Sequence, residues 1–188
     1  MLNCLKVPGA MERGSQKQIP VGAAFEMLQV LWPDFVEVNG CVFAAFQWKE
    51  SYSGWGEPKT ETESFINHTH IFDEFLNGAT LEYRKPVSNK LDVTEEIYDE
   101  SHPDFLAACK LGKTVARMWA MKLKADFPSE QFRVYYTQYD NPIVRFHKVR
   151  VNEHVWLSDQ GLLDASDASF RDAIICDTAH LSAPIVKK

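Results

Sequence analysis

Four side chains suited to binding or acid–base chemistry alternate with apolar residues between positions 131 and 150. They are Arg133, Tyr135, Arg145 and His147. Such alternation is typical of β-strands, in which successive side chains point to opposite faces. On a hairpin the four would lie within cross-strand reach of one another. Guanidinium groups beside an aromatic wall suit a small anionic ligand, such as a carboxylate or phosphate, or an acidic protein surface. We take these residues as the candidate binding site.

The length of the hairpin loop decides which residues share a face. An odd loop, of three or five residues, leaves one face apolar, with Phe132, Val134, Tyr136, Val144 and Phe146. An even loop would mix charged and apolar side chains on both faces, so the pattern favours the odd loop. This register predicts that Val134 and Phe146 are buried. It also predicts that Arg133 and Arg145 are largely exposed.

A second group of polar residues invites a metal site: His68, His70, Asp73 and Glu74. We expect a helix over residues 62–77, where His68 and His70 would lie about 160° apart. Two histidines spaced in this way bind one metal readily from a strand but poorly from a helix, so we predict no metal here and no cofactor. His68 falls on the apolar side of this helix. It is either a hydrogen-bonded core residue or a catalytic base with a pKa shifted by burial.

A basic stripe follows the next predicted helix, formed by Lys110, Lys113, Arg117 and Lys124. Such a stripe can contact a phosphate backbone, or it can pair with the acidic run between residues 92 and 104. The net charge of −6 argues against a general nucleic-acid binder. Nucleic acid is therefore an unlikely partner, and whether the stripe meets another partner stays open.

The sequence contains no GxSxG, Walker, HExxH or Rossmann glycine motif. This favours a non-enzymatic binding or assembly module that uses an open sheet face. The alternative is a small enzyme with a pocket between sheet and helices. In that enzyme His68 or His147 would be the acid–base group, and Arg145 would hold an anion.

The pattern of the whole chain predicts an α+β fold, with an antiparallel sheet built from two β-hairpins and helices packed on one face. The helices are expected at 20–31, 62–77 and 101–126, with a further short helix within 164–175. The hairpins are expected at 35–48, around the turn Asn39-Gly40, and at 131–150. A short strand is expected at 80–83.

Two of these helices carry clear apolar faces. In the first, Phe25, Leu28 and Trp32 are expected to point inward, with Val21 one turn earlier. In the third, Ser101 is expected to cap the N-terminus. The small residues of its apolar face allow a close approach to a sheet. They are Ala108, Gly112 and Ala116.

The length of 188 residues suits one domain, over 19–188, preceded by a loose arm at 1–18 and ending in an irregular segment. The four cysteines are far apart and are expected to be reduced thiols: Cys4, Cys41, Cys109 and Cys176. The N-terminus lacks the pattern of a signal peptide, and no apolar run is long enough to span a bilayer. We therefore expect a cytoplasmic protein without a membrane segment.

A homodimer is also expected. Tyr and Arg are enriched where protein surfaces bury one another. A two-fold interface could place Tyr135 and Arg145 of one copy against the acidic run 92–100 of the other.

Overall fold

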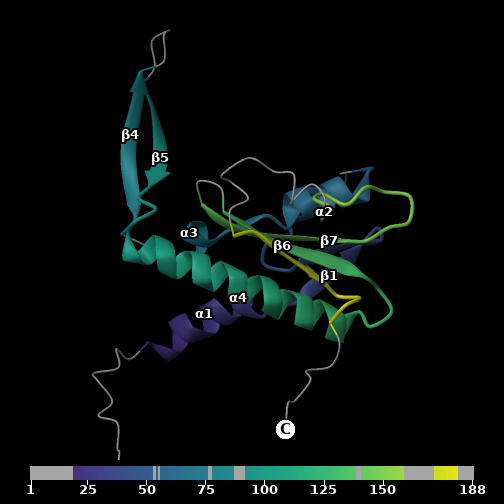
Figure 1. Ribbon diagram of the computed structural model, residues 1–188. Coiled ribbons are helices and arrows are strands. Elements are labelled where there is room, and N and C mark those ends of the chain that lie inside the picture. The colour runs from purple at the N-terminus through teal and green to yellow at the C-terminus, as the bar shows by residue number, and fades with distance from the viewer. Residues whose placement is uncertain are drawn as a thin grey trace, which may run out of the picture.

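A computed structural model of the chain describes residues 19–52, 54, 56–75, 78–86, 92–138, 141–158 and 172–181, and only the backbone at 80–86 and 92–97. The α+β class predicted from the sequence is confirmed (Figure 1). The helices are α1 (Val21–Leu31), η1 (Glu50–Tyr52), α2 (Lys59–Ile66), α3 (Ile71–Glu74) and α4 (Pro103–Asp126). The strands are β1 (Phe35–Val38), β2 (Cys41–Ala44), β3 (Thr69–His70), β4 (Thr80–Pro86), β5 (Asp92–Tyr98), β6 (Phe132–Gln138), β7 (Pro142–Lys148) and β8 (Ile174–Asp177).

Both hairpins expected from the sequence form, each within a sheet of its own. The first is the two-stranded sheet β1–β2, and the second lies at the centre of a four-stranded sheet with the order β3-β7-β6-β8. A third hairpin, β4–β5, projects away from the rest of the molecule (Figure 1). The sequence analysis predicted only the first half of β4 and no strand over β5. The segment that contains β5 was interpreted only as an acidic run, because six acids lie between residues 92 and 104.

The register of the central hairpin agrees with the sequence prediction. Val134 pairs with Phe146 and Gln138 with Pro142, which leaves a loop of three residues, 139–141. Val134 and Phe146 are both 0% exposed. The alternation of apolar and polar residues therefore determined which face of this hairpin enters the core.

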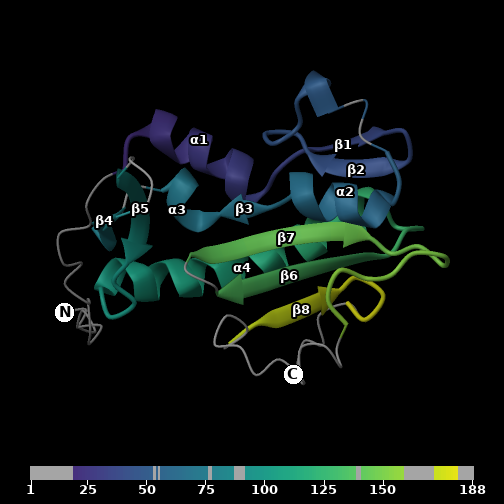
Figure 2. The ribbon, with the colours of Figure 1, turned by 90° about the horizontal axis from the view of Figure 1, so that it is seen from above.

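Helix α4 covers that apolar face and forms the core with it (Figure 2). Its buried residues are Phe105, Ala108, Gly112, Val115, Ala116, Trp119, Ala120 and Leu123. At Gly112 the helix comes so close to the sheet that a Cβ atom would lie 2.7 Å from the ring of Tyr136. The prediction that small residues permit a close approach is confirmed.

The N-cap prediction for α4 is wrong by one residue. His102 is the N-cap, and its Nδ1 accepts a hydrogen bond from the amide of Asp104 at 3.1 Å. The Ser101 hydroxyl instead donates to the Asp99 carboxylate at 2.6 Å. Ser101 thus lies two residues before the helix begins.

The first hairpin is built on the Asn39-Gly40 turn, as expected. Both residues have positive φ, 53° at Asn39 and 76° at Gly40, the conformation that a two-residue hairpin turn requires. The second strand ends at Ala44 rather than Trp48, because the chain then turns and the amide of Trp48 donates to the Ala44 carbonyl at 3.1 Å.

The expected helix over 62–77 is wrong. It is replaced within the described residues by helix α2, strand β3 and the single turn α3. The break occurs at Asn67, whose side chain bonds to two strands. Its Oδ1 accepts from the amide of Ala44 at 3.0 Å, and its Nδ2 donates to the carbonyls of Val42 at 2.9 Å and Phe146 at 3.3 Å. These tertiary hydrogen bonds override the local helical preference.

Glu63, one helical turn before Asn67, binds the same two strands and is 0% exposed. Its carboxylate accepts from the amides of Val42 and Lys148, both at 2.7 Å, and pairs with Arg150. Figure 2 shows α2 between the β1–β2 hairpin and β7. Glu63 of α2 and its C-cap residue Asn67 thus form hydrogen bonds that join the two sheets.

Helix α1 forms where it was expected, but its orientation was predicted wrongly. The four residues expected to point inward are exposed: Val21, Phe25, Leu28 and Trp32. The opposite side contacts the body, because Val30 is buried and its carbonyl accepts from Trp119 Nε1 at 2.7 Å.

The C-terminal segment differs from the expectation where it is described. Residues 174–177 form β8, which pairs with β6, so the predicted helix does not extend to residue 175. Residues 164–171 of that predicted helix, the arm at 1–18 and Cys4 lie outside the described residues. Cys41, Cys109 and Cys176 are free thiols, as predicted.

Of the helices in the described ranges, none is long and apolar enough to cross a bilayer.

Candidate anion-binding site

The four predicted site residues lie on one face of the four-stranded sheet, the face turned away from α4. Arg133 pairs with His147 and Tyr135 with Arg145 across the two strands. This face is not open, however. Tyr135 and His147 are 0% exposed and the two arginines are half-buried, so the predicted exposure of Arg133 and Arg145 is wrong. Trp156 covers part of the face, with its ring 5.2 Å from that of Tyr135.

His147 has internal partners for both ring nitrogens. Nδ1 lies 2.9 Å from the Lys148 carbonyl, which only accepts, so Nδ1 carries the proton. Nε2 then accepts from the Tyr135 hydroxyl at 2.8 Å and from the Trp156 amide at 3.3 Å. Burial lowers the pKa of His147 to about 4 and raises that of Tyr135 to about 12. At neutral pH this pair is therefore an uncharged structural contact.

Arg133 is paired within the sheet. Its Nε lies 3.3 Å from the carboxylate of Asp177, which is opposite Arg133 in β8. Gln131 donates to the same carboxylate at 3.0 Å. The guanidinium of Arg133 therefore ties β8 to β6.

Arg145 differs from the other three. Its guanidinium carbon lies 3.9 Å from the centre of the Trp156 ring, a cation–π contact. Across the described residues no carboxylate forms an ion pair with it, and its Nε is buried without a hydrogen-bond partner. Burial lowers the pKa of Arg145 to about 10, so it remains a cation at neutral pH. Arg145 is thus a half-buried positive charge with an unused donor.

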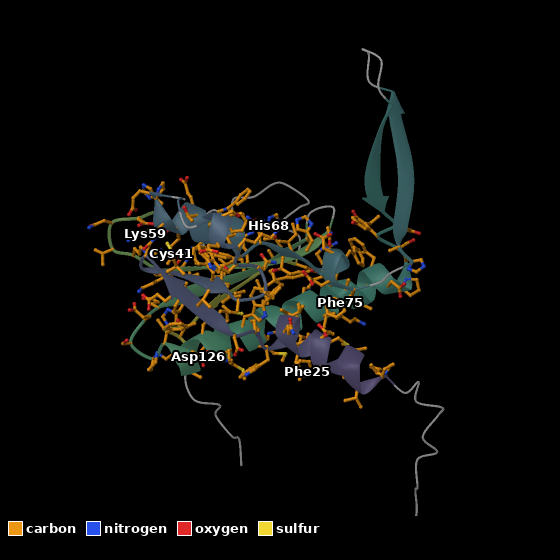
Figure 3. All side chains as sticks on the ribbon, turned by 180° about the vertical axis from the view of Figure 1, so that it is seen from behind. Phe25, Cys41, Lys59, His68, Phe75 and Asp126 are labelled. Atoms are coloured by element: carbon orange, nitrogen blue, oxygen red, sulfur yellow. The ribbon has the colours of Figure 1, made fainter. Side chains whose placement is uncertain are left out.

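Strand β3 brings two histidines beside Arg145. Thr69 pairs with Val144 and His70 with Ile143, so the antiparallel register places His68 next to Arg145. The rings of His68 and His70 are 4.3 Å apart. Figure 3 shows His68 just beyond α2. Strand β3 begins at the next residue, Thr69. The sequence prediction that these histidines lie on different helix faces is wrong, because the segment is not a helix.

The side chains around Arg145 carry further unused atoms. Asn141 is 2% exposed, and its Nδ2 contacts His70 Nδ1 at 3.1 Å. Its Oδ1 and the Nε2 of His68 are buried and have no hydrogen-bond partner in the part of the chain that the structure describes. Burial lowers the pKa of His68 to about 4, and the neighbouring Arg145 and His70 add to this effect. The three unsatisfied groups are thus linked through neighbours, since Asn141 contacts His70, the ring of His70 lies beside that of His68, and His68 lies next to Arg145. Buried polar groups without hydrogen-bond partners are rare in native proteins, and a bound ligand would supply the missing partners.

A groove of about 330 Å³ reaches the cluster at His68. It is lined on the polar side by Gln47, Lys49 and Glu74, and its apolar wall includes Phe46 and Tyr52. A volume of this size accommodates a small ligand. Burial raises the pKa of Glu74, and the nearby Asp73 raises it further.

The cluster suits an anion better than a metal. In the ranges described here, no three His, Cys, Asp or Glu side chains come together as a ligand set. The positive charge of Arg145 would also repel a cation beside His68 and His70. His70, Asn141 and Trp156 were missed as site residues. The His-x-His spacing is suited to a strand and was the available signal. It was not used because a helix was expected over this segment.

The residues of the basic stripe on α4 have different surroundings. Lys113 pairs with Asp172 at 3.3 Å, and Lys124 donates to the Pro128 carbonyl at 3.2 Å. Arg117 is exposed.

Comparison of the chain with protein-family models, with curated proteins and with solved structures finds no match in any of the three.

Proposed function

We propose that the chain is a non-enzymatic binding protein that takes the oxyanion of a small ligand, a carboxylate or a phosphate, at Arg145. The observation that carries this proposal is the state of that guanidinium, which is held against Trp156 with a buried and unused Nε donor. Burying a cation costs desolvation free energy, and the attraction of an anionic partner offsets this cost. An arginine already fixed by an aromatic ring loses little entropy when the anion binds.

A small ligand fits this site better than a broad acidic protein surface. Of the four residues predicted to contact a partner, Arg133 is paired with Asp177, and Tyr135 and His147 bond to each other. Among the described residues, Arg145 keeps a buried donor without a partner, and His68 and Asn141 each keep one such atom. The recognition surface is therefore compact, as a small anion requires.

The enzyme alternative loses one of its two acid–base candidates. Both nitrogens of His147 are occupied, and burial lowers its pKa to about 4. His68 retains an unused nitrogen, but its pKa is also lowered to about 4, far from the neutral value that general acid–base catalysis favours. We therefore place binding before catalysis.

Thermal unfolding in the presence of single anions tests the proposal. Inorganic phosphate, sulfate, acetate and citrate are added at constant ionic strength, since a ligand of the folded state at 100 times its Kd stabilises it by about 2.7 kcal/mol. At least one should raise the Tm of the wild type and leave R145Q unchanged. R117Q removes an exposed arginine from α4 and should retain the wild-type response. Equal shifts in wild type and R145Q, or no shift with any anion, would contradict the proposal.

A further inference from the structure

The outer side of α1 carries an apolar stripe that nothing in the described residues covers. Val21 is 87% exposed, Phe25 63%, Leu28 53% and Trp32 41%. Figure 3 shows Phe25 on α1 at the periphery of the molecule. Exposed apolar side chains are common singly, but a contiguous row of them marks a contact surface.

The spacing of this stripe matches the seam of a pair of helices. The four residues are separated by four, three and four positions. Val21, Phe25 and Leu28 fall within about 60° on a helical wheel, and Trp32 is the C-cap that follows them. This is the a/d spacing by which one helix packs against another. The stripe can therefore receive a helix.

The composition beside the stripe favours a second copy of α1 as that helix. The positions on its flanks are uncharged: Gly22, Ala24, Gln29 and Leu31. The one charged residue of α1 is Glu26, which lies outside the seam. Two copies can therefore approach without repulsion in this region, although the whole chain has a net charge of −6. Because the flanks are uncharged, they also cannot form ion pairs with a charged partner helix.

The sizes of the side chains indicate an antiparallel pair. About a two-fold axis between positions 26 and 27, Val21 meets Trp32 of the other copy and Phe25 meets its Leu28. Each contact then joins a larger to a smaller side chain, which fills space evenly. In a parallel pair, like residues would meet, with Trp32 against Trp32 at one end and Val21 against Val21 at the other.

We propose that the protein is a homodimer in which the α1 helices of two copies pack antiparallel along the stripe of Val21, Phe25, Leu28 and Trp32. This surface replaces the sheet face expected from the sequence, because Tyr135 is 0% exposed and has no surface left to offer. The interface does not involve Arg145, and it holds whether or not an anion binds there. Since four side chains per copy form a small interface, we expect a dissociation constant in the micromolar range.

The molar mass in solution tests the proposal, measured by light scattering and sedimentation over a range of concentrations. The wild type should approach twice 21.5 kDa at high concentration. F25E/L28E, which places four acids in the antiparallel seam, should stay monomeric, with a dissociation constant raised at least about 100-fold. V151S removes an apolar residue that is 101% exposed elsewhere and should dimerise as the wild type does.

F25K/L28E distinguishes the orientation. In the antiparallel pair the lysine introduced at position 25 faces the glutamate introduced at position 28 of the other copy, so dimerisation should be stronger than for F25E/L28E. Unchanged circular dichroism verifies that each variant folds. A monomeric wild type at every concentration would overturn the dimer. A dimer unaffected by F25E/L28E would overturn the interface, and equal monomerisation of both double variants would overturn the antiparallel arrangement.

Discussion

Glu63 and Arg150 form a bidentate ion pair at the junction of the two sheets, with Nη1 to Oε2 and Nη2 to Oε1 both at 2.8 Å. Arg150 also donates to the carbonyl of Gly40 at 2.9 Å, at the turn of the first hairpin. One buried carboxylate and one arginine thus hold α2, the β1–β2 hairpin and the end of β7 in a fixed arrangement.

Replacing Glu63 by alanine should therefore destabilise the protein strongly. It leaves the guanidinium of Arg150 without its charge partner and the amides of Val42 and Lys148 without acceptors. Loss of one member of a buried pair costs about 3–5 kcal/mol. Urea denaturation measures the change. Glu61→Ala, at an exposed position of the same helix, should change the free energy of unfolding by less than about 0.5 kcal/mol. Similar losses in the two variants would contradict a structural role for Glu63.

Gly112→Ala should lower stability, although alanine is the better helix former by about 1 kcal/mol. The new methyl group would lie 2.7 Å from Cε2 of Tyr136, whose ring is fully buried. Such overpacking costs about 1–3 kcal/mol. Gly22→Ala on α1 is the matched control, because a Cβ there meets nothing within 4 Å. In thermal melts Gly22→Ala should be neutral or stabilising. An increase in Tm for Gly112→Ala would show that α4 does not lie this close to the sheet.

Elements specified by their own sequence were predictable. The register of β6–β7 follows from strict alternation, the first hairpin follows from Asn39-Gly40, and the buried side of α4 follows from its apolar periodicity. The segment 59–74 was not predictable in this way. Its break depends on hydrogen bonds from Asn67 to Val42, Ala44 and Phe146, which are distant in the sequence.

The candidate site was predictable only in part, for the same reason. The alternation placed Arg145 correctly on the second sheet face. It could not show that Arg133 is paired with Asp177 or that Trp156 packs on Arg145. The orientation of α1 was also missed. An apolar stripe predicts that a helix face packs against something, but it does not distinguish the chain's own core from another molecule.

The stability of the protein should decrease as the pH falls from about 6.5 to about 4. His147 has a folded-state pKa lowered from 6.5 to about 4, so the unfolded chain binds a proton in this range that the folded chain does not. Its contribution is fully present above pH 6.5 and is lost on acidification. At about 1.4 kcal/mol per pH unit, the loss from His147 is about 3 kcal/mol at pH 4.

Denaturant unfolding at several pH values measures this slope, and the slope should be shallower in His147→Gln. His154→Gln, at an exposed position, should retain the wild-type slope. His68 has a pKa lowered in the same direction, so a smaller slope should persist in His147→Gln. An unchanged slope in that variant would show that His147 is not the buried neutral group described above.

Anion binding at Arg145 should strengthen as the pH falls, and this dependence should require His68. In the free protein, burial and the positive charge of Arg145 keep His68 neutral. A bound anion reverses the local charge and raises the pKa of His68, so binding takes up a proton. The affinity should therefore increase from about pH 7 to about pH 5, the range over which a histidine with a partly restored pKa titrates.

Sulfate is the suitable probe because its own charge is constant over this range. Its affinity is measured by calorimetry in the wild type and in two variants. His68→Gln should abolish the pH dependence but retain binding, whereas His154→Gln should preserve both. Other titratable groups near His68 are His70 at a ring distance of 4.3 Å, and Lys49 and Glu74 in the adjoining groove. If one of these were the proton acceptor, the pH dependence would survive in His68→Gln and the role given to His68 would be wrong.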